Sequence, residues 1–467
     1  MSYDDRDYWR DYDRRQDYYR EQDRTRDFNL ELDRQWENNQ EDLKYETEKR
    51  KLELEEGIKA MREGNTAWGI SKVAGPDFAV RYLQNLKTVD SRPYAYTTAL
   101  EYANRARKKM AQQNYSGAIR DCNEAIQLGM ENASIYYQRG LAFHEQEMYE
   151  NAMADYTKAI QLDSSFAMAK LERGICRLEM KNTAGALDDF NAFISIKPEL
   201  PRAYFWRGLA FYDLGELEGA EKNFGTALQL DNTYAPAFGM RALVHKRLGH
   251  YKEAINDLTE EIRLNPKSTK AYRSRAYCYF SMGDYGKAVA DNDYLISGCP
   301  TVEDYRLRAW SHFHLGNYHQ AIQDFEQVIA TSAVSPGDLI GRGRARQGKG
   351  DYPGALQDFS QAIQKNSNHP SAYHFRGLLR FNLGQFSEAI ADLDQDIHIN
   401  PNLPSAYLIR GEKLQKIGNK TSAMQDFQKA ASLFREQKMP EKAVEAMKRW
   451  TATLMSPLSP NDRLPTG

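Results

Sequence analysis

One segment of the chain has a spacing that could bind a nucleotide phosphate. Residues 343–350 read Gly-Arg-Ala-Arg-Gln-Gly-Lys-Gly, and a glycine-rich loop that ends in lysine can hold phosphate oxygens. Such a loop also needs Ser or Thr after the lysine to bind magnesium, but Gly350 stands there, and no strand precedes the segment. The sequence therefore predicts a helix and a turn here, with a local basic patch formed by Arg342, Arg344, Arg346 and Lys349.

Other residues that could perform chemistry are also better explained by structure. His312, His314 and His319 lie close together in the sequence, but residues two apart point to different sides of a helix and no cysteine completes a metal set. Neither a Gly-x-Ser-x-Gly elbow nor a His-Glu-x-x-His motif occurs. We therefore expect no enzymatic activity, no cofactor and no metal.

Arginine and aspartate recur at matched positions, and this pattern leads from chemistry to the elements that carry it. The arginines are Arg105, Arg139, Arg173, Arg207, Arg241, Arg275, Arg308, Arg342, Arg376 and Arg410. The acids are Asp121, Asp155, Asp189, Asp257, Asp291, Asp324, Asp358, Asp392 and Asp426, with Asn223 as the tenth member. Balanced counts favour bidentate Arg–Asp pairs that join the two helices of a hairpin or two adjacent hairpins. A basic surface for an acidic ligand is the functional alternative.

The same period appears in small residues. The sequence Tyr-x-x-Ala recurs in close variants with alanines at Ala118, Ala152, Ala186, Ala220, Ala254, Ala288, Ala321, Ala355, Ala389 and Ala423, and the gaps are 34 residues with one of 33. Twelve residues before each alanine lies another Gly or Ala, which allows two helices to approach closely. Gly residues recur between them from Gly215 onward, where the chain must turn.

Over roughly residues 99–437 this unit resembles the tetratricopeptide repeat family, whose 34-residue repeat is a helix–turn–helix hairpin. The resemblance implies an all-α solenoid of ten repeats that form a right-handed superhelix. It also implies that the first helix of each repeat lines a concave groove, where extended or helical peptides bind. The expected function is therefore that of a scaffold or adaptor in complex assembly.

Projecting the first-helix face of the family onto the central repeats predicts a peptide-binding surface of arginines, lysines and aromatic residues. Such residue types dominate binding hot spots. We expect a partner with acidic and apolar side chains. The predicted groove residues are Arg202, Phe205, Trp206, Tyr212, Lys246, Arg247, Lys270, Arg273, Tyr277, Phe280, Arg306, Trp310 and Phe313. The alternative is that some of these aromatic residues fill contacts within hairpins.

Two acidic residues break the pattern of small apolar residues in the second helices. Glu261 and Asp396 are expected to be partly buried, and a buried carboxylate needs a cationic partner. We expect Arg273 or Arg275 beside Glu261, and Arg410 beside Asp396.

Composition limits the partners and the compartment. The formal net charge is −2, which disfavours general attraction to nucleic acid or to anionic membranes. No apolar run approaches the roughly 18 residues of a membrane span. The cysteines show no paired spacing, which favours a reduced, cytoplasmic protein.

The segments outside the repeats have a different composition. Residues 1–64 form a charged arm rich in Tyr, Arg and Asp, expected to be helical or disordered, and their apolar residues keep no clean heptad for a coiled coil. Residues 65–98 are expected to form a linker and an N-terminal cap, and residues 438–467 a capping helix and a mobile tail. Through the arm, a self-assembling structural protein remains an alternative function, and nucleic-acid association through Arg/Tyr-rich stretches is another.

Overall fold

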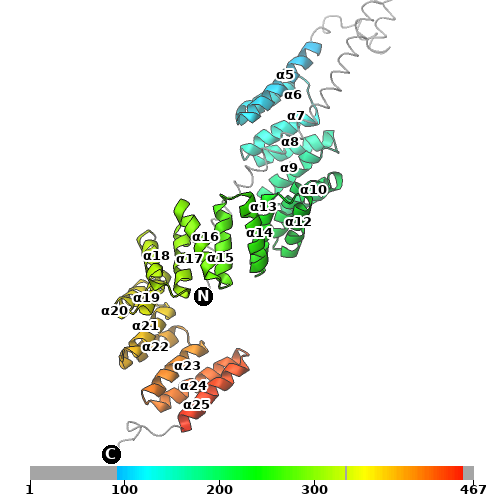
Figure 1. Ribbon diagram of the computed structural model, residues 1–467. Coiled ribbons are helices and arrows are strands. Elements are labelled where there is room, and N and C mark those ends of the chain that lie inside the picture. The colour runs from blue at the N-terminus through cyan, green and yellow to red at the C-terminus, as the bar shows by residue number, and fades with distance from the viewer. Residues whose placement is uncertain (1–91, 332–333, 456–467) are drawn as a thin grey trace, which may run out of the picture. The chain divides into compact units, whose positions relative to one another are not determined.

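The computed structural model describes residues 92–331 and 334–455, and every regular element among them is an α-helix (Figure 1). The chain divides into two compact units, Met1–Ala237 and Phe238–Gly467. The first unit contains α5 (Arg92–Ala111), α6 (Tyr115–Gln127), α7 (Ala133–Glu145), α8 (Tyr149–Leu162), α9 (Ala167–Glu179), α10 (Thr183–Ile196), α11 (Pro201–Asp213) and α12 (Leu217–Leu230).

The boundary between the units falls within α13 (Ala235–Arg247). The helices that follow are α14 (Tyr251–Leu264), α15 (Thr269–Ser281), α16 (Tyr285–Gly298), α17 (Val302–His314), α18 (Tyr318–Thr331), α19 (Pro336–Lys349), α20 (Tyr352–Lys365), α21 (Pro370–Asn382), α22 (Phe386–Ile399), α23 (Pro404–Lys416), α24 (Lys420–Glu436) and α25 (Pro440–Met455). The expected all-α solenoid is confirmed.

Helices α5 to α24 form ten hairpins, each of which pairs an odd-numbered first helix with the even-numbered second helix that follows; α13 and α14 are joined by Arg241 and Asp257. The helix α25 packs on α24 and buries Ala443 and Ala446. At the other end α5 begins at Arg92, inside the stretch predicted as linker and cap. The predicted arm, most of that linker and the tail lie outside the described residues.

Several hairpins close where a glycine of the first helix meets an aromatic ring of the second. A Cβ atom placed on Gly208 would lie 2.7 Å from Cε1 of Phe224, closer than packed carbon atoms approach. The same contact joins Gly140 to Tyr156 and Gly343 to Phe359. Because only a residue without a side chain leaves room for the ring, the recurring Gly sets the distance between the two helices.

The turns inside the hairpins require a left-handed backbone. Gly215 has a φ of 78°, and the glycines at the same place in the later hairpins also have positive φ angles. In the first three hairpins Gln113, Glu147 and Lys181 adopt this conformation with φ between 58° and 61°. A side chain makes that region unfavourable by roughly 1 kcal/mol, so these three turns are held by the packing around them.

The periodic arginines and aspartates pair across each hairpin. Arg173 donates from Nε to Oδ2 of Asp189 at 3.0 Å and from Nη2 to Oδ1 at 2.7 Å. Nine hairpins contain this bidentate pair, and the partners are always sixteen positions apart in the sequence. The hydrogen bond from Arg105 lowers the pKa of Asp121 despite its burial. Of the two predicted arrangements, the pair within one hairpin is correct.

The remaining guanidinium nitrogen reaches the preceding hairpin. Nη1 of Arg173 donates to Oγ1 of Thr157 at 3.1 Å, and Nη1 of Arg410 donates to Oδ1 of Asp394 at 2.7 Å. Seven arginines of the series make this third contact with a second helix of the hairpin before their own. Each of them therefore joins three helices.

The fourth hairpin offers a test, because its arginine has a neutral partner. Arg207 donates to Oδ1 of Asn223 at 2.7 Å, and burial without a carboxylate lowers the pKa of Arg207. We expect Asn223→Asp to stabilise the protein by about 1–2 kcal/mol, because a charged acceptor forms stronger hydrogen bonds. Urea unfolding followed by circular dichroism measures the change.

Two controls accompany this substitution. The pairing should lower the pKa of the new carboxyl group in the folded state, so the gain should be present above the ordinary aspartate pKa of about 3.9 and vanish as pH falls through the folded value. Asn191 also accepts a hydrogen bond from Arg207, but at an exposed site, so Asn191→Asp should have a smaller effect. Equal effects of the two substitutions would contradict the importance of the buried pair.

Candidate functional site

The first helices of neighbouring hairpins contact one another within each unit. Such contacts join α7 to α9 and α9 to α11 in the first unit, and α15 to α17, α17 to α19 and α19 to α21 in the second. The side of each unit formed by these helices is called the first-helix face below. Several of the predicted groove residues, among them Arg202, Arg273 and Arg306, contact a neighbouring first helix across this face.

In the first unit, the predicted groove arginine Arg202 already forms an ion pair within the protein. Nη2 of Arg202 in α11 lies 3.2 Å from Oε1 of Glu172 in α9, and the Glu172 side chain is buried. His144 of α7 lies on the other carboxylate oxygen, with Nδ1 at 3.8 Å. Arg202 therefore helps to neutralise a buried acid.

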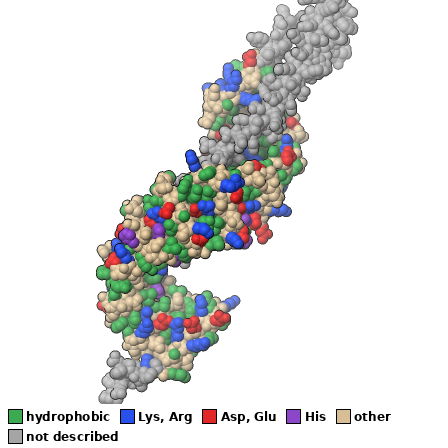
Figure 2. Space-filling model, viewed as in Figure 1, with side chains coloured by type: hydrophobic (Ala, Val, Ile, Leu, Met, Phe, Trp, Pro, Cys, Tyr) green, Lys and Arg blue, Asp and Glu red, His purple; other side chains and the backbone are tan. Residues whose placement is uncertain are grey.

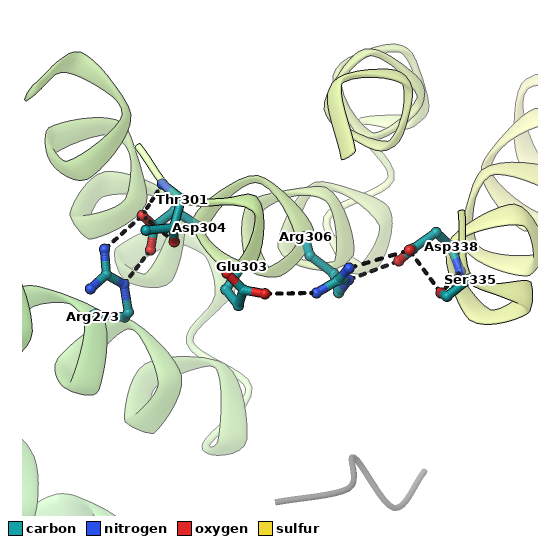
Figure 3. A network of polar contacts seen from close by, with 7 residues as sticks. All are labelled: Arg273, Thr301, Glu303, Asp304, Arg306, Ser335 and Asp338. Carbon is teal, nitrogen blue, oxygen red and sulfur yellow. Dashed lines mark hydrogen bonds and ion pairs between the residues drawn. The ribbon is translucent and has the colours of Figure 1, made fainter. Parts of the chain in front are cut away.

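Two predicted arginines of the second unit are paired in a similar way (Figure 3). Arg273 in α15 donates from Nε and Nη2 to Asp304 in α17 at 2.7 and 2.9 Å. Asp304 also caps its own helix by accepting hydrogen bonds from the amide and the hydroxyl of Thr301. Bidentate geometry and full burial of the acid make this a strong contact between first helices.

The same arrangement recurs one hairpin later (Figure 3). Arg306 in α17 donates to Asp338 in α19, with Nε at 2.8 Å and Nη2 at 3.3 Å. Ser335 donates its hydroxyl to Asp338 at 2.7 Å, and Glu303 lies 3.4 Å from Nη1 of Arg306. The basic character expected of this face is thus partly offset by acids that the sequence analysis did not assign to it.

A third arginine on the first-helix face has a different environment. The guanidinium carbon of Arg344 in α19 lies 4.6 Å from the ring centre of Phe313, 4.8 Å from that of Phe375 and 5.4 Å from that of Trp310. These rings belong to α17 and α21, the neighbouring first helices. Among the described residues no carboxylate pairs with Arg344, and burial lowers its pKa.

The sequence predicts Arg344 as part of a local basic patch and not as a groove residue. A signal was present, because Arg344 directly follows the small residue Gly343 of its helix. Two members of the predicted groove, Tyr277 and Trp310, hold the same place in α15 and α17. Alignment of the repeats by their small residues would have found it.

Three of the predicted groove residues, Phe205, Trp206 and Trp310, have buried side chains. Phe205 is fully buried and packs against Phe224 and Tyr234. Trp206 and Trp310 are each only 5% exposed, and the Trp310 ring contacts Phe325 edge to face. These side chains belong to the hairpin cores, so removing them would open cavities.

The other predicted residues have mixed exposure. Lys246 is buried, with its ammonium 4.8 Å from the ring centre of Tyr277, which places a cation–π contact between α13 and α15. Arg247 is exposed. The remaining residues are partly exposed; these are Tyr212, Lys270, Phe280 and Phe313.

The two irregular acids have partners other than those predicted. Glu261 accepts a hydrogen bond from Ser268 Oγ at 2.9 Å, whereas Arg273 pairs with Asp304 and Arg275 pairs with Asp291. Burial raises the pKa of Glu261 to about 7.

For Asp396 the partner is His374, whose Nδ1 lies 2.9 Å from Oδ2. The predicted partner, Arg410, binds Asp426 and Asp394. Of the arginines expected beside these acids, Arg275 and Arg410 are held by the periodic aspartates of their own hairpins.

The residues considered for phosphate binding, metal binding or nucleophilic chemistry have structural roles instead. Residues 343–349 are helical within α19, and Gly350 ends that helix with a φ of 91°. The phosphate-loop interpretation therefore fails. No group of three His, Cys, Asp or Glu residues is placed to hold a metal ion in the part of the chain that the structure describes. Burial raises the pKa of the Cys122 thiol to about 12, so this thiol is not a nucleophile at neutral pH.

The surface carries both signs of charge. Lys and Arg side chains are interspersed with Asp and Glu side chains on the face that Figure 2 shows. None of the described helices is long and apolar enough to cross a membrane. The distinctive feature is thus local, and it is the succession of cations and aromatic rings on the first-helix face.

Parts of the sequence and of the fold resemble known proteins. Models described as tetratricopeptide repeat match residues 133–166, 201–234, 240–302 together with 340–406, and 307–331. No curated protein matches the chain.

Several solved structures resemble parts of the chain. A tetratricopeptide repeat protein from Parabacteroides merdae is 21% identical, covers 53% of this chain and 99% of its own, and has a TM-score of 0.40. The C-terminal part of a repeat protein from Cytophaga hutchinsonii is 17% identical, covers 51% and 98%, and has a TM-score of 0.45. YrrB, described as having an unusual peptide-binding site, is 21% identical, covers 37% and 89%, and has a TM-score of 0.33.

The raised pKa of Glu261 gives a testable pH dependence. The unfolded chain releases this proton near pH 4.5 and the folded chain near pH 7, so wild-type stability falls as pH rises between these values. Glu261→Gln should therefore stabilise the protein at pH 8 by an amount on the order of 3 kcal/mol. Urea unfolding measured from acid to alkaline pH checks this expectation.

The adjacent Glu260 provides the matched control. Its side chain is 44% exposed and pairs with Arg263 one turn away, so Glu260→Gln should change stability little at any pH. The gain from Glu261→Gln should disappear below about pH 4.5, where the glutamate is protonated in both states. A gain that is independent of pH would show that burial of the charge is not its cause.

Proposed function

Since the chain belongs to the tetratricopeptide repeat family, we propose that it is a scaffold that holds a peptide segment of a partner protein on its first-helix face. The repeats support protein–protein interaction in general. The finer statement, that a peptide binds this face during complex assembly, is the part that experiment must test.

The observation that carries the proposal is the interleaving of cations and aromatic rings on one face of the second unit. Lys246 lies over Tyr277, and Arg344 lies among Phe313, Phe375 and Trp310. Aromatic residues and arginines contribute most to peptide affinity because they bury large areas and form directional contacts. The local charge balance favours a peptide over a nucleic acid, which requires a run of unpaired cations.

Residues 1–30 are a second candidate occupant of the same face. They carry Tyr3, Tyr8, Trp9, Tyr12 and Tyr18 among many aspartates, which is the chemistry expected of the partner peptide. A tethered segment competes at an effective concentration on the order of mM, so weak contacts suffice. Such binding would fold the arm back on its own molecule or link neighbouring molecules.

Site-specific photo-cross-linking tests the binding face. With p-benzoylphenylalanine in place of Phe280, a half-exposed aromatic residue of α15, we expect adducts to a small set of partner peptides, which mass spectrometry identifies. The control places the same group at Tyr352, which is 43% exposed on the second helix α20. If both positions gave the same adducts, or neither gave any, the proposed binding face would be wrong.

Deletion of residues 1–64 tests the tethered occupant. If the arm competes for the first-helix face, the shortened chain should bind the cross-linked peptide several-fold more tightly, because no tethered segment must be displaced. Fluorescence anisotropy measures the affinity, and sedimentation at several protein concentrations measures self-association. Unchanged affinity together with an unchanged oligomeric state would eliminate both roles of the arm.

A further inference from the structure

We propose that Arg344 and the aromatic rings around it bind the carboxylate of an aspartate or glutamate in the partner peptide, beside an aliphatic or aromatic residue of that peptide. The proposal rests on the proposed function and specifies the chemistry of the ligand. It concerns a site within the second unit, formed by α17, α19 and α21.

Arg344 differs from the arginines next to it in the same helix. Nη2 of Arg342 lies 2.6 Å from Oδ1 of Asp358, and Nη1 of Arg346 lies 3.0 Å from Oδ2 of the same carboxylate. Both are thus part of the bonding within the hairpin. Arg344 points to the other first helices and meets three rings, with no carboxylate among the described residues.

The face also changes character at this helix. From α15 to α17 and from α17 to α19, neighbouring first helices are joined by Arg273–Asp304 and Arg306–Asp338. At the place that Arg273 and Arg306 hold in their helices, α19 has Ile340, and α19 instead reaches α21 through Arg344, which contacts the ring of Phe375. Between neighbouring first helices of this unit, the chain's own acids pair with arginines as far as α19, and beyond it an acid of a bound peptide can pair with Arg344 instead.

An anion would complete the electrostatics of the site. Arg344 is half-buried, and among the described residues only cation–π contacts compensate for its lost hydration. Such contacts are weaker than an ion pair with a carboxylate. A guanidinium on aromatic faces can still present its N–H donors in its own plane, the geometry that binds both oxygens of a carboxylate. Because the rings hold the side chain in place, little rotamer entropy is lost on binding.

The local charge suits a carboxylate better than a phosphate. Arg342 and Arg346 are occupied by Asp358, so Arg344 contributes one positive charge. His314 lies nearby, and burial together with the charge of Arg344 lowers its pKa, so it is neutral at pH 7. A monoanion matches a single cation. The half-exposed rings of Phe313 and Phe375 provide the apolar surface for the neighbouring residue of the peptide.

The test uses the full-length chain and an array of short fluorescent peptides in which a central Asp or Glu is flanked by Leu, Phe or Tyr. Each peptide has two counterparts, one with Asn or Gln and one with phosphoserine at the centre. We expect the best acidic peptides to bind about tenfold more tightly than their amide counterparts, since truncating or neutralising one partner of a desolvated charge pair has at least this effect.

The variants assign that difference to one side chain. Arg344→Gln should abolish the preference for acid over amide. Arg344→Lys should restore part of the preference, because it keeps the charge but loses the planar fork. The matched control is Arg435→Gln, on an exposed arginine of α24, which should bind like the wild type. Circular dichroism verifies folding, and if Arg344→Gln fails to fold, Arg344→Lys still decides the matter.

The outcomes are distinguishable. If acidic and amide peptides bind equally, or if the preference survives in both Arg344 variants, the carboxylate site is wrong while the scaffold function stands. If phosphoserine peptides bind more tightly than acidic ones and depend on Arg344, a dianion is the ligand and the carboxylate proposal is overturned. If no peptide binds and Phe280 yields no cross-link, the proposed function fails as well.

Discussion

The bidentate pair between an arginine and an aspartate sixteen residues later holds together nine of the ten described hairpins of this protein. Two guanidinium nitrogens bind the carboxylate of the second helix, and in most hairpins the third binds a polar side chain of the preceding hairpin. A buried charge is stabilised only when its partner has good geometry and its remaining donors are used, and this arrangement meets both conditions. The close contact between glycine and aromatic ring then fixes how near the two helices lie. Stacking of hairpins follows from these two contacts repeated.

The same helices use arginine for two purposes, and the difference is one of register. Arg342 lies on the side of α19 that meets its own second helix, where Asp358 neutralises it. Arg344, two residues later, lies on the side that meets the neighbouring first helices, where rings replace the acid. Because residues two apart on a helix face different directions, one short sequence can stabilise a hairpin and still present a cation for binding.

The sequence predicts the hairpins well, because a strict period identifies which residues are equivalent. It predicts the face less well, because equivalent positions receive different side chains. Phe205, Arg273 and Arg306 each stand three residues before the small residue of their helix. The phenylalanine turns into the core, whereas the arginines extend along the face to an acid of the next helix. Position alone does not decide between these results; the size and polarity of the side chain do. The predicted partners of Glu261 and Asp396 differ from the observed ones for a related reason, since Arg275 and Arg410 pair with the aspartates of their own hairpins.

The backward reach of the third guanidinium nitrogen gives the array a direction that bears on its synthesis. In each case this nitrogen donates to a side chain of the preceding hairpin. During synthesis the preceding hairpin emerges from the ribosome first. At roughly 5–20 residues per second a hairpin emerges over seconds, while helical pairs with local contacts fold in microseconds to milliseconds. Each new hairpin can therefore dock on a finished surface before the next one appears. No contact in this scheme waits for a later hairpin, and α25 packs on the preceding helix α24 in its turn.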